Sequence, residues 1–428
     1  MDILPQLQSA IGLLVFPLIA LLFRPKVTRA ALDSPWRLDT RVCLVAVAIQ
    51  IVLALLLLKV SWFQAFFNLL NGGVLAVQEA TAAGTSFVFG YLGGGELPYE
   101  ETNPSASFIL AFRALPLVIV IGALTALLSY WKILPLIIEG LSKAFAKTLN
   151  IGGAVALSGA ANIFVGMTEA PLFIRNSIKK LSYSELFMVM TLGMSTVAGT
   201  VLVLYATFLE TVLPNAIGHI FTASIISVPA AVLIAITMVP QVGKPTPSDA
   251  EVAFDYNGPV DAVAQGGMNA MQMLISILAL LVSFIALVYL TNMLLGQLPM
   301  VGGAELSLER ILGWIMAPIC WLMGIPWSEA TTAGSLMGIK TILNELLAFI
   351  QLSQLPPEAL SPRSDLVISY ALCGFANFGS LGILIGGLST MAPERREDIA
   401  SLGLLSIVSG TLSTCMTASV IGLISSAA

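Results

Sequence analysis

Long apolar runs are the feature that most constrains what this chain can fold into. A membrane-spanning helix needs about 20 mainly apolar residues to cross a hydrocarbon core about 30 Å thick. Eight spans are predicted, at Ile11–Phe23, Val42–Leu58, Leu115–Tyr130, Leu186–Phe208, Ile217–Val239, Met271–Leu290, Leu366–Leu388 and Leu402–Ser425. The first is extended back to Ile3 by residues that are less apolar. We therefore expect an all-α polytopic membrane protein with about eight transmembrane helices.

The charge content favours the same class of fold. Only 10% of the 428 residues are charged, whereas soluble domains carry roughly 25%. A soluble enzyme or a disordered regulator of this length is disfavoured, because the chain has too few charges to form a polar surface. The net charge is −5, from 19 Lys and Arg against 24 Asp and Glu, and indicates no nucleic-acid partner.

Four further segments are apolar but interrupted. Ser61–Tyr91 and Leu134–Thr148 are amphipathic, which predicts helices that lie in the membrane interface. Ile151–Ile174 and Trp327–Leu352 are each broken near the middle by small or polar residues and one carboxylate. We expect these two segments to form re-entrant helical hairpins, because irregular backbone at membrane depth is tolerated only beside protein or a watery cavity.

Basic residues in short loops predict the orientation of the chain. The loop between the first two spans should be cytoplasmic, because it holds Arg24, Lys26, Arg29, Arg37 and Arg41. The loop Gly93–Ser107 has acidic residues and no basic ones, so it should face outward, whereas the loop 241–261 fits the rule poorly. Eight spans and two hairpins place both termini on the periplasmic side of the cell inner membrane.

The two halves of the chain carry a similar pattern. Glu169 lies in the first broken segment and Glu345 in the second, and a later span in each half is interrupted, at Met194–Thr200 and Gly374–Gly382. Inverted repeats of this kind are typical of secondary transporters, whose binding site lies where the broken helices meet. We predict scaffold spans and the first interfacial helix in residues 1–130, a first repeat in 131–265 and a second in 266–428.

Glu169 and Glu345 are the strongest candidate functional residues. An ionisable group at membrane depth costs roughly 2.5–3.5 kcal/mol, so it needs a reason to be there. Each carboxylate either caps its own hairpin tip or accepts hydrogen bonds from hydroxyls or amines of a substrate. Two other classes stay open, an intramembrane hydrolase that uses both carboxylates and an ion channel. The chain has no phosphate-binding Gly-Lys-Ser/Thr loop, which argues against ATP as the driving force.

Five stretches of the chain resemble the concentrative nucleoside transporter family: Asn162–Leu172, Thr196–Gly199, Gly338–Glu345, Tyr370–Asn377 and Gly386–Gly387. The likeness runs from about Phe108 to the C-terminus. It implies a homotrimer in the lipid bilayer, with a scaffold part and a mobile transport part. It also implies symport of nucleosides with sodium, or with protons as in some members, by elevator-type alternating access and without enzymatic chemistry.

The resemblance also implies roles for single residues. Thr168 and Glu169 would face the nucleobase, Glu345, Asn377 and Ser380 would hold the ribose hydroxyls, and Phe375 and Val201 would line the pocket. Sodium would be held by the side chains of Asn162 and Thr196 and by the backbone carbonyls of Val165 and Val197. Oxygen ligands suit a hard cation.

Three positions depart from the family pattern. Met167 stands where the family usually has Gln, so base preference is the property most affected. An amide that meets the base is replaced by a thioether, and each buried polar group left unpaired costs about 1–3 kcal/mol. Val155 stands where many relatives have Glu, and Leu346 replaces the Phe that usually follows the second hairpin's glutamate.

Overall fold

The structure is a computed structural model that describes residues 4–24, 40–100, 108–210, 212–241, 245–247 and 256–425. In these residues the secondary structure is helical, apart from one isolated bridge between Val301 and Ala304. Most of the predicted basic loop between the first two spans, including Lys26, Arg29 and Arg37, lies outside the described residues.

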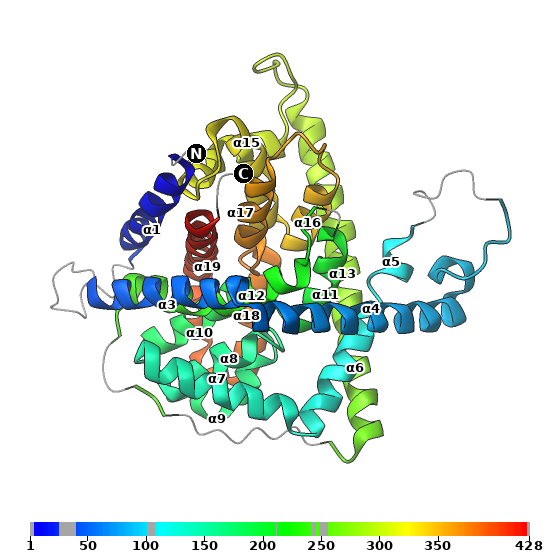
Figure 1. Ribbon diagram of the computed structural model, residues 1–428, viewed down its shortest axis with the longest axis horizontal. Helices are drawn as coiled ribbons and strands as arrows, with labels where there is room; N and C mark the ends of the chain where they lie inside the picture. The colour runs from blue at the N-terminus through cyan, green and yellow to red at the C-terminus, as the bar shows by residue number, and fades with distance from the viewer. Residues whose placement is uncertain are drawn as a thin grey trace.

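The helices follow one another along the chain as shown in Figure 1. The α-helices are α1 (Leu4–Leu22), α3 (Thr40–Lys59), α4 (Ser61–Phe89), α5 (Leu110–Arg113), α6 (Leu117–Tyr130), α7 (Ile133–Leu149), α8 (Gly153–Asn162), α9 (Arg175–Ile178), α10 (Tyr183–Ser195), α11 (Gly199–Leu209), α12 (Ala216–Met238), α13 (Pro259–Leu295), α14 (Leu308–Leu322), α15 (Trp327–Ile342), α16 (Glu345–Ser353), α17 (Pro362–Leu372), α18 (Phe378–Met391) and α19 (Arg396–Ile424). The 3₁₀ helices are η1 (Gly90–Gly93), η3 (Ala170–Ile174) and η4 (Pro393–Arg395).

Six helical segments of the described chain are long and apolar enough to cross a membrane, and each overlaps a predicted span: Leu4–Leu22, Leu110–Tyr130, Tyr183–Leu209, Ala216–Met238, Pro259–Leu295 and Pro393–Ile424. The predicted span Val42–Leu58 corresponds to α3, which qualifies as a span only as a bent pair with α4, the two helices meeting at an angle of 67°. The predicted span Leu366–Leu388 is divided between α17 and the short apolar helix α18.

Both predicted hairpins contain the expected break. α8 ends at Asn162 and irregular backbone leads to η3, whereas α15 ends at Ile342 and α16 begins at Glu345. The two interrupted spans are also broken, between α10 and α11 and between α17 and α18. In Figure 1, α8 lies toward the lower end of the molecule and α15 toward the upper end, which is the arrangement expected of an inverted repeat.

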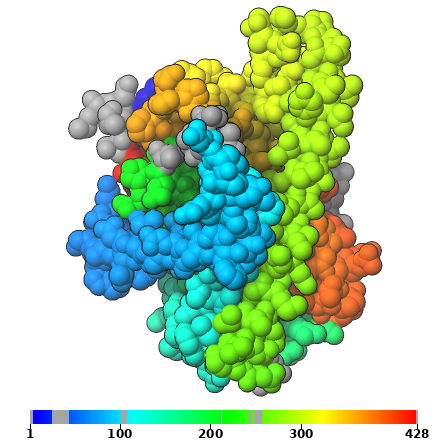
Figure 2. Space-filling view, turned by 90° about the vertical axis from the view of Figure 1, so that its right-hand side faces the viewer, coloured from blue at the N-terminus to red at the C-terminus, as the bar shows by residue number. Residues whose placement is uncertain are grey.

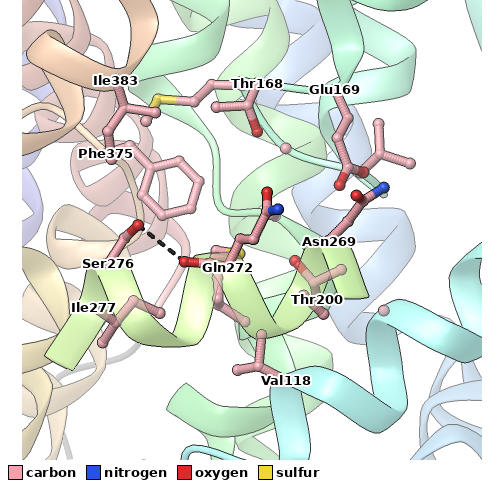
Figure 3. Close-up of a pocket in the computed structure, with 18 of the residues that line it drawn as sticks. Val118, Thr168, Glu169, Thr200, Asn269, Gln272, Ser276, Ile277, Phe375 and Ile383 are labelled. Atoms are coloured by element: carbon pink, nitrogen blue, oxygen red, sulfur yellow. Dashed lines mark hydrogen bonds between the residues drawn. The ribbon is translucent and has the colours of Figure 1, made fainter. Parts of the chain in front are cut away.

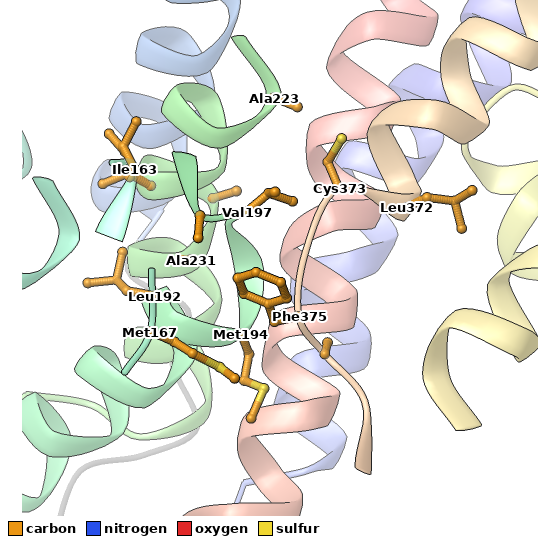
Figure 4. Close-up of a cluster of buried hydrophobic side chains, with 14 of the residues drawn as sticks. Ile163, Met167, Leu192, Met194, Val197, Ala223, Ala231, Leu372, Cys373 and Phe375 are labelled. Carbon is orange, nitrogen blue, oxygen red and sulfur yellow. The ribbon is translucent and has the colours of Figure 1, made fainter. Parts of the chain in front are cut away.

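Small residues allow the broken segments to meet near the middle of the molecule. The N–H of Gly199 donates to the carbonyl of Phe164 at 3.0 Å, which joins the first hairpin to the α10–α11 break. A Cβ on Gly410 of α19 would lie 2.5 Å from the Cβ of Met194 and 3.1 Å from that of Ala376. α19 therefore passes close to both broken spans, and apolar side chains fill the space between them (Figure 4).

α6 and α13 form a closely packed pair at one side of the molecule. In the first half of α13 the buried residues recur at every fourth position, at Ala262, Gly266, Ala270 and Leu274. A Cβ on Gly266 would lie 2.5 Å from the Cβ of Ala126 in α6, so small residues let the two helices approach closely. α13 extends along most of the height of the molecule, with α4 lying across it (Figures 1 and 2).

Candidate functional site

A cavity of about 650 Å³ lies between the hairpin tips and α13. Its lining includes all the side chains that the sequence predicts to contact a substrate: Thr168, Glu169, Val201, Glu345, Phe375, Asn377 and Ser380. These residues come from both hairpins, from α11, from the α17–α18 break and from the first turn of α18, so the fold gathers segments that are far apart in sequence. Figure 3 shows Thr168, Glu169 and Phe375 around this space, with α13 running past it.

Glu345 is held by two partners at the tip of the second hairpin. The hydroxyl of Tyr205 donates to its Oε1 at 2.5 Å, and Nδ2 of Asn377 donates to its Oε2 at 2.9 Å. The Tyr205 ring packs against Phe349, with the ring centroids 5.2 Å apart. Each carboxylate oxygen keeps a further lone pair, because a carboxylate offers about four acceptor positions. The carboxylate is therefore oriented and still able to accept hydrogen bonds from hydroxyls.

Two asparagines begin helices at the site. Oδ1 of Asn377 accepts from the N–H of Ser380 at 2.7 Å and thereby caps α18. Oδ1 of Asn344 accepts from the N–H of Leu347 at 2.9 Å and caps α16. Side-chain caps of this kind satisfy N–H groups that the helix leaves unpaired. The capping role at the second hairpin therefore belongs to Asn344, and the side chain of Asn377 joins the helix end to Glu345.

Lys340 has a structural position beside this site. Its side chain is fully buried, and Nζ donates to the carbonyl of Ala371 at 2.7 Å and to Oγ1 of Thr414 at 2.9 Å. Ala371 lies in the last turn of α17, where a cation is favoured by the negative end of the helix dipole. Lys340 therefore stabilises the C-terminal end of α17, and its contacts within the described residues call for no role in substrate binding.

Glu169 lies at the first hairpin tip and is half-buried beside the cavity. It precedes η3, and its side chain makes no capping hydrogen bond to that helix. Tyr256, in the segment before α13, also lines the cavity. The pKa of Tyr256 is raised by partial burial and then by the negative charges of Glu169 and Asp261. Its phenol therefore keeps its proton near the Glu169 carboxylate at physiological pH.

The residues predicted to bind sodium lie where the first hairpin meets the α10–α11 break, and one of them, Val165, also lines the cavity. Asn162, Val165, Thr196 and Val197 are all buried. Nδ2 of Asn162 donates to the carbonyl of Leu192 at 2.8 Å and to Oγ1 of Thr196. Oδ1 of Asn162 is buried and has no hydrogen-bond partner among the described residues. An orphaned amide oxygen beside hydroxyl and carbonyl oxygens is a suitable donor set for a hard cation.

Two findings at the site were not predicted from the sequence. Tyr205 was not predicted as a site residue, although a tyrosine hydroxyl in an apolar span indicates a buried hydrogen-bond partner. Ser224 of α12 was also not predicted, and its hydroxyl donates to the carbonyl of Val197 at 3.3 Å. Met167, where the family usually has Gln, lies in the apolar cluster near Met194 (Figure 4).

Comparison with known families agrees with this architecture. Residues 219–422 match the family described as the C-terminus of the Na⁺-dependent nucleoside transporters, and residues 11–92 match the corresponding N-terminus. Residues 111–212 match a family described as nucleoside recognition. Together these matches cover most of the chain, including both hairpins and both broken spans.

Individual proteins are similar over almost the whole chain. The nucleoside permease NupC of Helicobacter pylori is 35% identical over 98% of both chains. Human solute carrier family 28 member 3 is 33% identical over 98% of this chain, which spans 60% of that longer protein. The structure of CNTnw in an inward-facing substrate-bound state matches with a TM-score of 0.87 at 36% identity, covering 97% of this chain and 98% of that one. The chain belongs to the concentrative, Na⁺-dependent nucleoside transporter family.

Proposed function

We propose that this protein imports nucleosides across the inner membrane by symport with sodium, through elevator-type alternating access. The observation that carries the proposal is the Glu345 carboxylate. It is oriented by Tyr205 and Asn377 and borders a cavity in the membrane-spanning part of the molecule. Vicinal ribose hydroxyls are suitable donors to such a carboxylate.

The remaining cavity residues complete a nucleoside site in this proposal. Asn377 and Ser380 hold the ribose together with Glu345, and Phe375 and Val201 provide apolar walls. Thr168 and Glu169 lie at the first hairpin tip and face the base. Both hairpin tips border one cavity, which supports a substrate held between the two repeats.

Sodium is the coupling ion that the donor set fits best. Asn162 and Thr196 supply side-chain oxygens, and Val165 and Val197 supply backbone carbonyls. The unpartnered Oδ1 of Asn162 supports this assignment, because a buried amide oxygen without a partner costs about 1–3 kcal/mol. The bound cation supplies positive charge where the first hairpin meets the α10–α11 break.

In this proposal residues 1–130 form the scaffold spans and the first interfacial helix. Residues 131–265 form the first repeat and residues 266–428 the second. The second repeat includes a further scaffold span, α13. The protein is a homotrimer in this proposal, as its family implies, and the exposed apolar faces of α13 and α4 are available to pack against other copies or lipid. Nε2 of Gln6 donates to the carbonyl of Ser425 at 3.4 Å, which supports both termini on one side of the membrane, and the basic residues of the loops assign that side to the periplasm. Native mass spectrometry of the purified protein should give the mass of three chains.

Uptake into proteoliposomes tests the proposal. Radiolabelled uridine, adenosine and guanosine are offered under an imposed sodium gradient, an imposed proton gradient or neither. Saturable accumulation that needs the sodium gradient is expected. Accumulation with the proton gradient alone would assign the coupling to protons instead. A chemically altered product without accumulation would favour the hydrolase alternative, and conductance without saturation would favour a channel.

A further inference from the structure

α13 presents a polar stripe to the cavity. Gln265, Asn269, Gln272 and Ser276 are spaced by four, three and four positions, which places them on one side of a helix. All four line the cavity, and Figure 3 shows Asn269, Gln272 and Ser276 along the part of α13 that passes it. The neighbouring exposed face of the same helix segment is apolar, with Met268, Met271 and Ile275.

Two members of the stripe already have partners within α13. Nε2 of Gln265 donates to both carboxylate oxygens of Asp261, at 2.9 and 3.0 Å. The hydroxyl of Ser276 donates to the carbonyl of Gln272 at 2.9 Å. These contacts satisfy the donors of Gln265 and Ser276 without any ligand.

The side-chain amides of Asn269 and Gln272 differ from these two. Neither makes a side-chain hydrogen bond in the part of the chain that the structure describes. Figure 3 shows the Asn269 amide on the same side of the cavity as Glu169, and the Gln272 amide directed toward the space beside Phe375 and Thr168. Each amide offers a donor and an acceptor side by side, which matches the polar edge of a nucleobase.

We propose that Asn269 and Gln272 are specificity-determining residues that bind the polar edge of the base from α13. The inference rests on the proposed nucleoside site and adds a recognition surface on a different helix from the hairpins. The chemical group recognised is the exocyclic amino or carbonyl group at this edge of the base.

The test compares nucleosides that differ only at this edge. Binding of adenosine is compared with that of purine riboside, which lacks the 6-amino group, and cytidine with pyrimidin-2-one riboside, which lacks the 4-amino group. Asn269→Leu and Gln272→Leu should weaken binding of the parent nucleosides about threefold to tenfold, the factor for one lost hydrogen bond. Binding of the analogues should change by less than about twofold, because the lost contact is absent in them.

Met268→Leu is the matched control, because it alters the exposed apolar face of the same helix segment, outside the lining of the cavity. It should leave all four affinities unchanged. Equal weakening of parent and analogue, or no weakening of either by both amide variants, would overturn the inference. Failure of the unmodified protein to bind or transport any of these nucleosides would instead overturn the proposed function. Melting temperature and elution volume report whether each variant is folded.

Discussion

Glu345 and its two hydrogen-bond donors are the residues whose chemistry bears most directly on substrate binding. Glu345 as a residue is only 4% exposed, and it borders the cavity, from which a ligand can reach it. Replacing it by Gln keeps the shape but removes the negative charge and turns one acceptor into a donor. Glu345→Gln should therefore reduce uptake of ribosides to background, while the elution volume of the assembly stays unchanged. Retained uptake would contradict the ribose assignment.

Tyr205 should act through Glu345. Tyr205→Phe keeps the ring against Phe349 and removes the hydroxyl that donates to the carboxylate. Hydrogen bonds to charged groups contribute about 1.5–3 kcal/mol, so nucleoside affinity should fall about tenfold or more. Isothermal titration measures the change. Tyr289→Phe on the exposed face of α13 is the matched control and should have no effect. Equal affinities in both variants would show that Tyr205 does not orient the carboxylate.

Among the helices and hairpins, the backbone of the first hairpin tip requires a glycine at position 166. Gly166 has a φ of +88°, and a Cβ there would lie 2.6 Å from the Cβ of Ala198. Gly166→Ala should destabilise the tip by roughly 1–3 kcal/mol, because it adds both backbone strain and a clash. We expect a lower melting temperature and weaker sodium binding.

Gly382→Ala in α18 is the matched control for this substitution. No atom lies within 4 Å of a Cβ at that position. Alanine is the better helix former, so the melting temperature should stay the same or rise slightly. A Gly166→Ala variant with unchanged sodium affinity and stability would show that the tip tolerates a side chain and does not shape the cation site.

α13 is longer than the span that its apolar run predicts. The predicted span begins at Met271, whereas the helix begins at Pro259. Gln265 and Asn269 interrupt the apolar run and so conceal the first turns of the helix. The structure places these side chains at the cavity, where polar groups are tolerated. By contrast, the breaks in the hairpins were predictable, because runs of small and polar residues mark them locally.

For the whole molecule, coupling between sodium and nucleoside is the property to measure. The sodium residues and the substrate residues share the first hairpin and the break that it contacts through Gly199 and Phe164. If sodium organises this tip before the nucleoside binds, sodium should raise the affinity for nucleoside. Reciprocity then requires that nucleoside raise the affinity for sodium by the same factor.

Titrations of each ligand in the presence and absence of the other check this prediction, with potassium as the ionic control. Potassium should not substitute for sodium. A nucleoside affinity that is the same in sodium and potassium would contradict coupling through the first hairpin. A dependence on pH in place of sodium would indicate that protons drive the transport.

The sequence by itself determined that this is a helical membrane protein, where its helices break and which carboxylates lie in the breaks. These properties follow from local hydropathy and from residues that favour or interrupt a helix. Only the tertiary structure decided that Tyr205 meets Glu345, 140 positions away, and that the stripe on α13 borders the cavity. Such contacts depend on which helix faces pack together, and packing is set by the shapes of side chains distant in sequence.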